Sequence, residues 1–185
     1  TTLKAWNMMV DRYKDQWNVI AADVFNEPFD ATWGTGDDTT DFNTWCETVG
    51  NTLHSGGASW LIMCEGVAQS PQCTDNCFWG EDLMGVHYAP VVLNTPNKIV
   101  YSPHVYGPSV AYQPYFAVKD FPNNMPNIWN THWGFIRATK TAAITVGEWG
   151  GQMSGSDEVW MNAFANYLVE IDAPDNWFWY VNPDS

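Results

Sequence analysis

Apolar residues along the chain form two alternating kinds of segment. In the first kind they recur at helical spacing, as Leu3, Trp6, Val10 and Tyr13 do, and in the second they form short continuous runs typical of buried strands. The helical spacing predicts helices over residues 3–13, 41–54, 125–139 and 158–171. The continuous runs predict strands over residues 19–25, 60–64, 99–107, 143–146 and 177–181. Buried strands that alternate with helices belong to parallel sheets covered on both faces, so the predicted class is α/β.

Two of the predicted strands end at a glutamate. Glu27 follows the first strand in the string Asn26-Glu27-Pro28, and Glu148 follows the strand over residues 143–146. The carboxyl ends of strands in a parallel α/β barrel converge on one mouth, so glutamates 121 positions apart (148 minus 27) can face each other. Two opposed carboxylates are the groups that a glycosidase uses. The alternative is structural, because proline ends a strand and asparagine tolerates a turn.

A third strand end carries polar aromatic side chains. His104 and Tyr106 are two positions apart in the strand over residues 99–107, so they point to one side. A histidine alone is more often structural than catalytic, but three such strand ends form a constellation. No metal-site or nucleophile-triad spacing links the remaining histidines, which are His54, His87 and His132.

Charge and composition limit the classes of molecule that the protein is expected to bind. The chain has 185 residues, with 7 Lys and Arg against 21 Asp and Glu, and a formal charge of −14 opposes binding to nucleic acid or to anionic lipid surfaces. No segment resembles a signal peptide or a membrane span, and no nucleotide-binding or zincin motif is present. The 12 Trp residues favour stacking on sugar faces, with bulky core packing as an equally good explanation. We find no repeat, linker or second domain.

The four cysteines divide by their surroundings. Cys73 and Cys77 lie in a polar stretch, where a local disulfide would stabilise a surface loop in an oxidising compartment. Zinc is the alternative, but a lone Cys-x₃-Cys is a weak metal motif. Cys46 lies on the apolar face of a predicted helix and Cys64 in a predicted strand, which predicts free buried thiols.

These motifs resemble glycoside hydrolase family 5, within the clan of (β/α)₈ TIM-barrel retaining glycosidases. The similarity to strands 4, 6, 7 and 8 of that barrel is carried by residues 23–28, 104–106, 147–148 and 179–183. Longer stretches at residues 90–94 and 121–126 resemble endo-β-1,4-glucanases of the family and favour cellulase over mannanase.

The resemblance implies roles for individual residues. Glu27 would be the acid/base and Glu148 the nucleophile. The substrate-binding residues that it implies are Asn26, His104, Tyr106, Trp179 and, on the aglycone side, Trp79. It implies neither cofactor nor metal, a β-glucan polysaccharide or oligosaccharide as substrate, and a secreted, extracellular enzyme.

The chain departs from the family pattern at its start. Family members have three strands before the one that ends at Glu27, and these carry an arginine, a histidine and aromatic residues of the active site. Residues 1–185 would therefore be a partial barrel holding the last five strands. Either the sequence is a fragment, or another polypeptide supplies the missing amino-terminal strands, or this is a truncated product. Hydrolysis of mannan, xyloglucan or mixed-linkage glucan, and a carbohydrate-binding remnant without catalysis, are the alternative functions.

Overall fold

The structure, a computed structural model, describes residues 2–173, and its strands are all parallel to their neighbours. The main sheet has the order β1 (Ala21–Asp23), β2 (Leu61–Cys64), β3 (Ile99–Tyr101) and β5 (Ala143–Ile144). A second pair joins β4 (His104–Tyr106) to β6 (Glu148–Gly150). The predicted parallel sheet is confirmed, although β1 is shorter than expected. The strand predicted over residues 177–181 lies outside the described residues.

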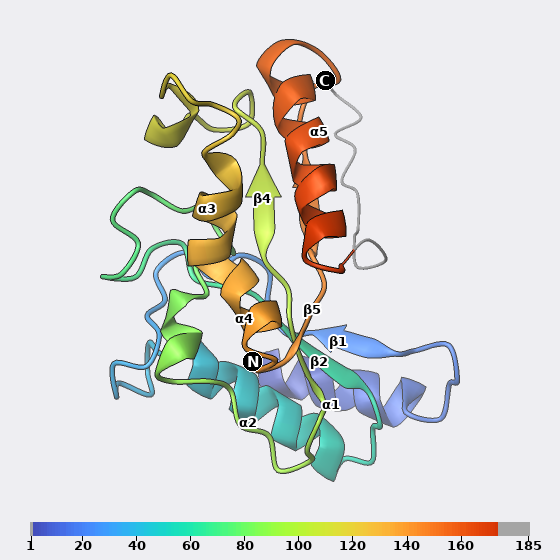
Figure 1. Cartoon of the computed structure of the whole chain (residues 1–185). Helices are drawn as coiled ribbons and strands as arrows, with labels where there is room; N and C mark the ends of the chain where they lie inside the picture. The colour runs from blue at the N-terminus through green and yellow to red at the C-terminus, as the bar shows by residue number, and fades with distance from the viewer. Residues whose placement is uncertain (1, 174–185) are drawn as a thin grey trace.

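The strand predicted over residues 99–107 is split into β3 and β4. Ser102 and Pro103 separate the two parts, and proline has no N–H to donate to a neighbouring strand. Gly147 N–H instead donates to the carbonyl of Pro103. The pair β4 and β6 thereby continues β3 and β5 toward their carboxyl ends, as the tall β4 arrow of Figure 1 shows.

Helices lie along the sheet where the apolar spacing predicts them. They are α1 (Thr2–Tyr13), α2 (Phe42–Ser55), α3 (Met125–Trp129), α4 (Phe135–Ala138) and α5 (Gly155–Glu170). The segment predicted as one helix over residues 125–139 is α3, a π-helical turn η3 (Asn130–Gly134) and α4 in succession. Short 3₁₀ turns are η1 (Met84–His87) and η2 (Pro114–Phe116). No helix within residues 2–173 is long and apolar enough to cross a bilayer.

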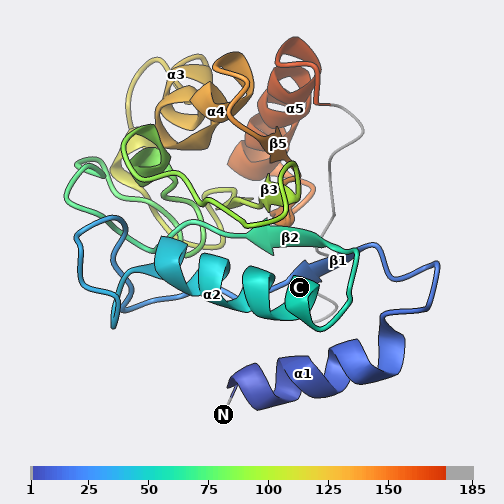
Figure 2. The same cartoon turned by 90° about the horizontal axis from the view of Figure 1, so that it is seen from below.

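The sheet has one face packed and one face open. Figure 2 shows the strands in a curved row, with α1 and α2 beside β1 and β2, and α4 and α5 beside β5. Side chains at alternate strand positions, such as Ile62 and Cys64, are fully buried among these helices. Leu61 and Met63, on the other face, are only partly buried. The second face is therefore the side on which Asp23 is exposed.

Most tryptophans of the described chain belong to the core. Trp33, Trp60, Trp129, Trp133 and Trp160 are buried, whereas Trp17 and Trp79 are 92% and 53% exposed. Core packing thus accounts for much of the aromatic content, and few of these residues are available to a sugar.

The prediction that Cys46 and Cys64 are free thiols is wrong. They form a disulfide with their Cα atoms 6.1 Å apart, because the apolar face of α2 packs against β2 and brings the two buried cysteines together. That separation is within the range that disulfides require. Cys73 and Cys77 form the second disulfide.

Candidate active site

Three strand ends bring Glu27, His104 and Glu148 together. The register of β4 and β6 pairs His104 with Glu148, and Glu27 lies beyond β1. One ligand atom from each of the three side chains lies within 4.8 Å of the others. His104 Nδ1 is 3.0 Å from Glu27 Oε1 and 3.9 Å from Glu148 Oε1. The structure therefore brings the predicted carboxylates to one place, with a histidine between them.

The two carboxylates are accessible, whereas the imidazole is not. The side chains of Glu27 and Glu148 are 21% and 29% exposed, and that of His104 is 2% exposed. Tyr106 donates its hydroxyl hydrogen to Glu148 Oε2. Glu148 is thus oriented from one side by the phenol while its carboxylate remains open to a ligand.

Glu27 has an unusual backbone conformation. Its φ angle is +46°, in the left-handed region that non-glycine residues seldom adopt. Its N–H donates to Glu65 Oε2 at 2.8 Å. The turn that presents the Glu27 side chain is therefore held by a second glutamate.

Two further acidic residues surround this site. Glu65 is 1% exposed. Burial and the nearby charge of Asp23 raise its pKa to about 9, although the hydrogen bond from Glu27 N–H acts to lower it. Although Asp23 is solvent-accessible, desolvation by the protein around it, opposed by His104 and reinforced by Glu148, raises its pKa to about 6. The sequence analysis missed Glu65, yet it follows the apolar run of β2 as Glu27 and Glu148 follow theirs.

Trp79 adjoins the backbone segment that packs against Glu65 and His104. It precedes Gly80, where a Cβ would come within 2.8 Å of Glu65 Oε2 and 3.2 Å of His104 Cβ. The exposed indole of Trp79 packs edge to face on Phe29, with ring centroids 5.1 Å apart. Its position suits stacking on a sugar next to the carboxylates.

The other predicted sugar contacts are less defined. Asn26 is exposed directly before Glu27. Trp179 lies outside the described residues.

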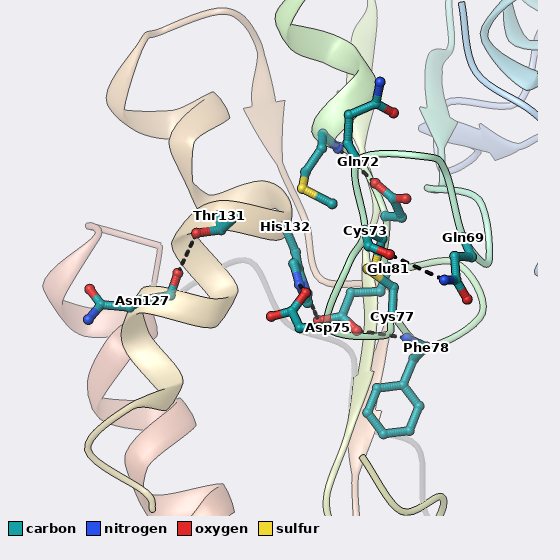
Figure 3. A network of polar contacts seen from close by, with 12 residues as sticks. Gln69, Gln72, Cys73, Asp75, Cys77, Phe78, Glu81, Asn127, Thr131 and His132 are labelled. Carbon is teal, nitrogen blue, oxygen red and sulfur yellow. Dashed lines mark hydrogen bonds and ion pairs between the residues drawn. A yellow bond between two sulfur atoms is a disulfide. The ribbon is translucent and has the colours of Figure 1, made fainter. Parts of the chain in front are cut away.

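A separate buried network surrounds the Cys73–Cys77 disulfide (Figure 3). His132, for which the sequence predicted neither a metal site nor a nucleophile triad, is fully buried. Its Nδ1 is 2.9 Å from Glu81 Oε1 and its Nε2 is 3.1 Å from Asp75 Oδ1. Burial alone lowers the pKa of His132, but the charge of Glu81 and the hydrogen bonds to Asp75 and Glu81 raise it to about 10. The two carboxylates therefore favour the protonated form of His132.

The same network bears on metal binding. A ring nitrogen of His132 and the sulfurs of Cys73 and Cys77 lie within 4.8 Å of one another, which is close enough for a zinc site. Both sulfurs are joined in the disulfide, however, and both ring nitrogens contact carboxylates. The arrangement in the structure is therefore a structural cross-link.

Comparison with known proteins identifies the family. The sequence profile described as "Cellulase (glycosyl hydrolase family 5)" matches residues 1–185. The chain belongs to glycosyl hydrolase family 5. An endoglucanase of Paenibacillus polymyxa is 43% identical over 187 aligned residues, covering 97% of this chain and 46% of that protein. The major extracellular endoglucanase of Xanthomonas campestris pv. campestris is 38% identical, covering 96% of this chain and 37% of that protein.

Solved structures of the family share the fold. The catalytic domain of the X. campestris endoglucanase matches with a TM-score of 0.90 at 37% identity, covering 100% of this chain and 54% of that one. A hyperthermophilic endocellulase from Pyrococcus horikoshii matches with a TM-score of 0.91 at 36% identity, covering 100% and 55%. The described strands are therefore part of a TIM barrel, as predicted. This chain spans less than half the length of the curated relatives named above and about half of these solved chains.

Proposed function

We propose that this chain carries the two catalytic carboxylates of a retaining endo-β-1,4-glucanase. The supporting observation is that carboxylate oxygens of Glu27 and Glu148 lie within 4.8 Å of each other. Retaining glycosidases hold their carboxyl groups about 5 to 5.5 Å apart, whereas inverting enzymes leave about 6.5 to 9.5 Å for a water molecule. The short separation favours direct attack by one carboxylate on the sugar.

The two glutamates then divide the reaction. Glu148 attacks the anomeric carbon and forms a glycosyl ester, while Glu27 gives its proton to the departing glycosidic oxygen. In the second step Glu27 takes a proton from water, the water oxygen bonds to the anomeric carbon, and the ester to Glu148 breaks. Tyr106 holds the Glu148 carboxylate in place, and His104 holds that of Glu27. Retention of configuration follows from the two successive inversions.

The names of the relatives favour β-1,4-glucan as the substrate. The relatives above are named endoglucanases, and one P. horikoshii endocellulase structure is a complex with cellotetraose. In this proposal Trp79 stacks on the aglycone side, and Asn26 and Trp179 make the other sugar contacts. Mannan, xyloglucan and mixed-linkage glucan remain alternative substrates for the same chemistry.

We place the enzyme outside the cell. Two disulfides within residues 2–173 favour an oxidising compartment, and one relative is named an extracellular endoglucanase. Residues 1–185 form one partial catalytic domain in this proposal, and the remaining strands of the barrel come from the rest of the protein or from a separate polypeptide.

The test compares substrates and a nucleophile variant in the complete barrel that contains this chain. Release of reducing ends should be faster on carboxymethylcellulose than on glucomannan. Glu148→Gln should abolish hydrolysis and retain binding of cello-oligosaccharides, whereas Glu170→Gln, an exposed control on α5, should change neither. A Glu148→Gln enzyme with normal turnover contradicts the mechanism. Binding without hydrolysis in the wild type would instead favour a non-catalytic carbohydrate-binding protein.

A further inference from the structure

Glu65 is a buried glutamate with no lysine or arginine partner among the described residues. It follows Leu61 and Met63 at alternate positions, which places it on the open face of the sheet next to the proposed catalytic site. Its side chain is nevertheless 1% exposed. A buried carboxyl needs hydrogen-bond partners to offset lost hydration. The role of Glu65 therefore depends on the groups that its two oxygens contact.

Each carboxyl oxygen of Glu65 contacts either Glu27 itself or a residue that is hydrogen-bonded to Glu27. Oε2 accepts the Glu27 N–H at 2.8 Å, within the left-handed turn of that residue. Oε1 lies 3.5 Å from His104 Nε2, and the opposite ring nitrogen, Nδ1, is 3.0 Å from Glu27 Oε1. Glu65 therefore contacts the backbone of Glu27 directly and its carboxylate through the imidazole.

The surrounding chain leaves little freedom to this arrangement. The Gly80 carbonyl accepts the N–H groups of Gly66 and His104 at 2.9 and 3.3 Å. At Gly80 even a methyl group would meet Glu65 Oε2 at 2.8 Å. Glu65 and His104 are thus held against one backbone segment.

Charge determines which form of Glu65 fits. Asp23, Glu27 and Glu148 all act electrostatically on Glu65, and within residues 2–173 the basic side chain that contacts it is His104. The raised pKa of Glu65, about 9, agrees with a neutral carboxylic acid at pH 7. A neutral acid has one carbonyl oxygen for the Glu27 N–H and one O–H that faces His104 Nε2.

We propose that Glu65 is a positioning residue that works as a neutral carboxylic acid. Its carbonyl oxygen fixes the Glu27 turn, and its O–H occupies Nε2 of His104, so the ring carries its hydrogen on Nδ1. That N–H then points at the Glu27 carboxylate. An ionised Glu65 would favour a proton on Nε2 and leave the Nδ1 lone pair facing a carboxylate oxygen. The role at Glu27 rests on the proposed function, whereas the tautomer of His104 does not.

The first test is the tautomer of His104, read from ¹⁵N NMR of histidine-labelled protein at pH 7. His104 signals are assigned by their loss in His104→Gln. We expect Nδ1 protonated and Nε2 unprotonated, and a protonated Nε2 overturns the proposal. This measurement needs no turnover, so it remains decisive even if the protein hydrolyses no glucan.

The second test replaces Glu65 in the complete barrel. Glu65→Gln retains an acceptor for Glu27 N–H and a donor for Nε2, so it should keep kcat and the Nδ1–H tautomer, and it should remove any loss of activity that sets in near pH 9. Glu65→Leu loses both contacts and should lower kcat roughly 100-fold with little change in KM. Equal losses in the Gln and Leu variants overturn the proposal.

Glu81→Gln is the matched control. Glu81 is also 1% exposed but contacts His132 instead of His104. It should lower stability and leave the pH profile and the His104 tautomer unchanged. Control variants that shift the profile as Glu65 variants do would show a general effect of buried glutamates and overturn the assignment.

Discussion

Replacing His132 by leucine tests the charge of the buried network around the Cys73–Cys77 disulfide. His132 is fully buried, and the change would remove the partner that it provides to Glu81, itself 1% exposed. Breaking a buried ion pair by removing one partner destabilises a protein by about 3 to 5 kcal/mol. The half-exposed Asp75 adds little, because solvent screens it. We therefore expect a loss of about 3 kcal/mol at pH 6.

The pH dependence gives the sharper test of His132. A folded-state pKa of about 10 lies above the unfolded value of 6.5, so the folded protein binds one more proton than the unfolded chain between these pH values. The stabilisation is complete below pH 6.5 and is lost as the pH rises through 10. The free-energy difference between wild type and His132→Leu should therefore shrink steadily over that range.

Urea unfolding of the complete barrel, followed by tryptophan fluorescence at pH 6, 8 and 10 with disulfides intact, measures this difference. His87→Leu is the control, because His87 is exposed on η1 and stacks on Phe135. Its effect should be small and independent of pH. A His132→Leu loss that is the same at pH 6 and pH 10 would show that His132 is neutral and would refute the reasoning.

Four further predictions concern the fold and the site. Replacing both Cys46 and Cys64 by alanine should destabilise the barrel by about 3 kcal/mol, because the disulfide closes a loop with a sequence separation of 18, as measured by urea unfolding. Trp79→Ala should raise KM for cello-oligosaccharides that extend over the aglycone side and leave hydrolysis of short aryl glycosides unchanged, whereas the fully exposed Trp17→Ala should change neither. Tyr106→Phe should lower kcat about 10- to 100-fold, since the hydroxyl that orients the Glu148 carboxylate is lost, and steady-state kinetics will detect it. The 185-residue chain alone should be aggregation-prone or inactive, because one edge of β1 has no partner among the described residues; soluble, monomeric and active material would contradict this.

The sequence was sufficient to predict the order of helices and parallel strands and the main pair of carboxylates, but not the breaks at residues 102–103 and 130–134. The spacing of apolar residues predicted the helices. The rule that strand ends converge predicted that Glu27 and Glu148 lie close together. The same rule also points to Glu65 after β2, but the sequence analysis did not apply it there. Nothing local distinguishes a glutamate that is buried as a neutral acid from one that is open to substrate.

Contacts between segments that are distant along the chain could not be predicted from the sequence. The Cys46–Cys64 disulfide depends on how α2 rotates against β2, which apolar spacing alone does not define. His132 lies 51 and 57 positions from its carboxylate partners Glu81 and Asp75. They become neighbours only because η3 packs against the loop that carries Asp75 and Glu81.

Trapping the covalent intermediate tests the central claim most directly. A 2-deoxy-2-fluoro-cellobiosyl fluoride slows both steps and should accumulate as an ester on the nucleophile of the complete barrel. Peptic digestion and mass spectrometry should then find the sugar on the peptide that contains Glu148, with none on the peptide that contains Glu27. A label on Glu27, or continued hydrolysis of β-glucan with no label on Glu148, would contradict the assignment of the two glutamates.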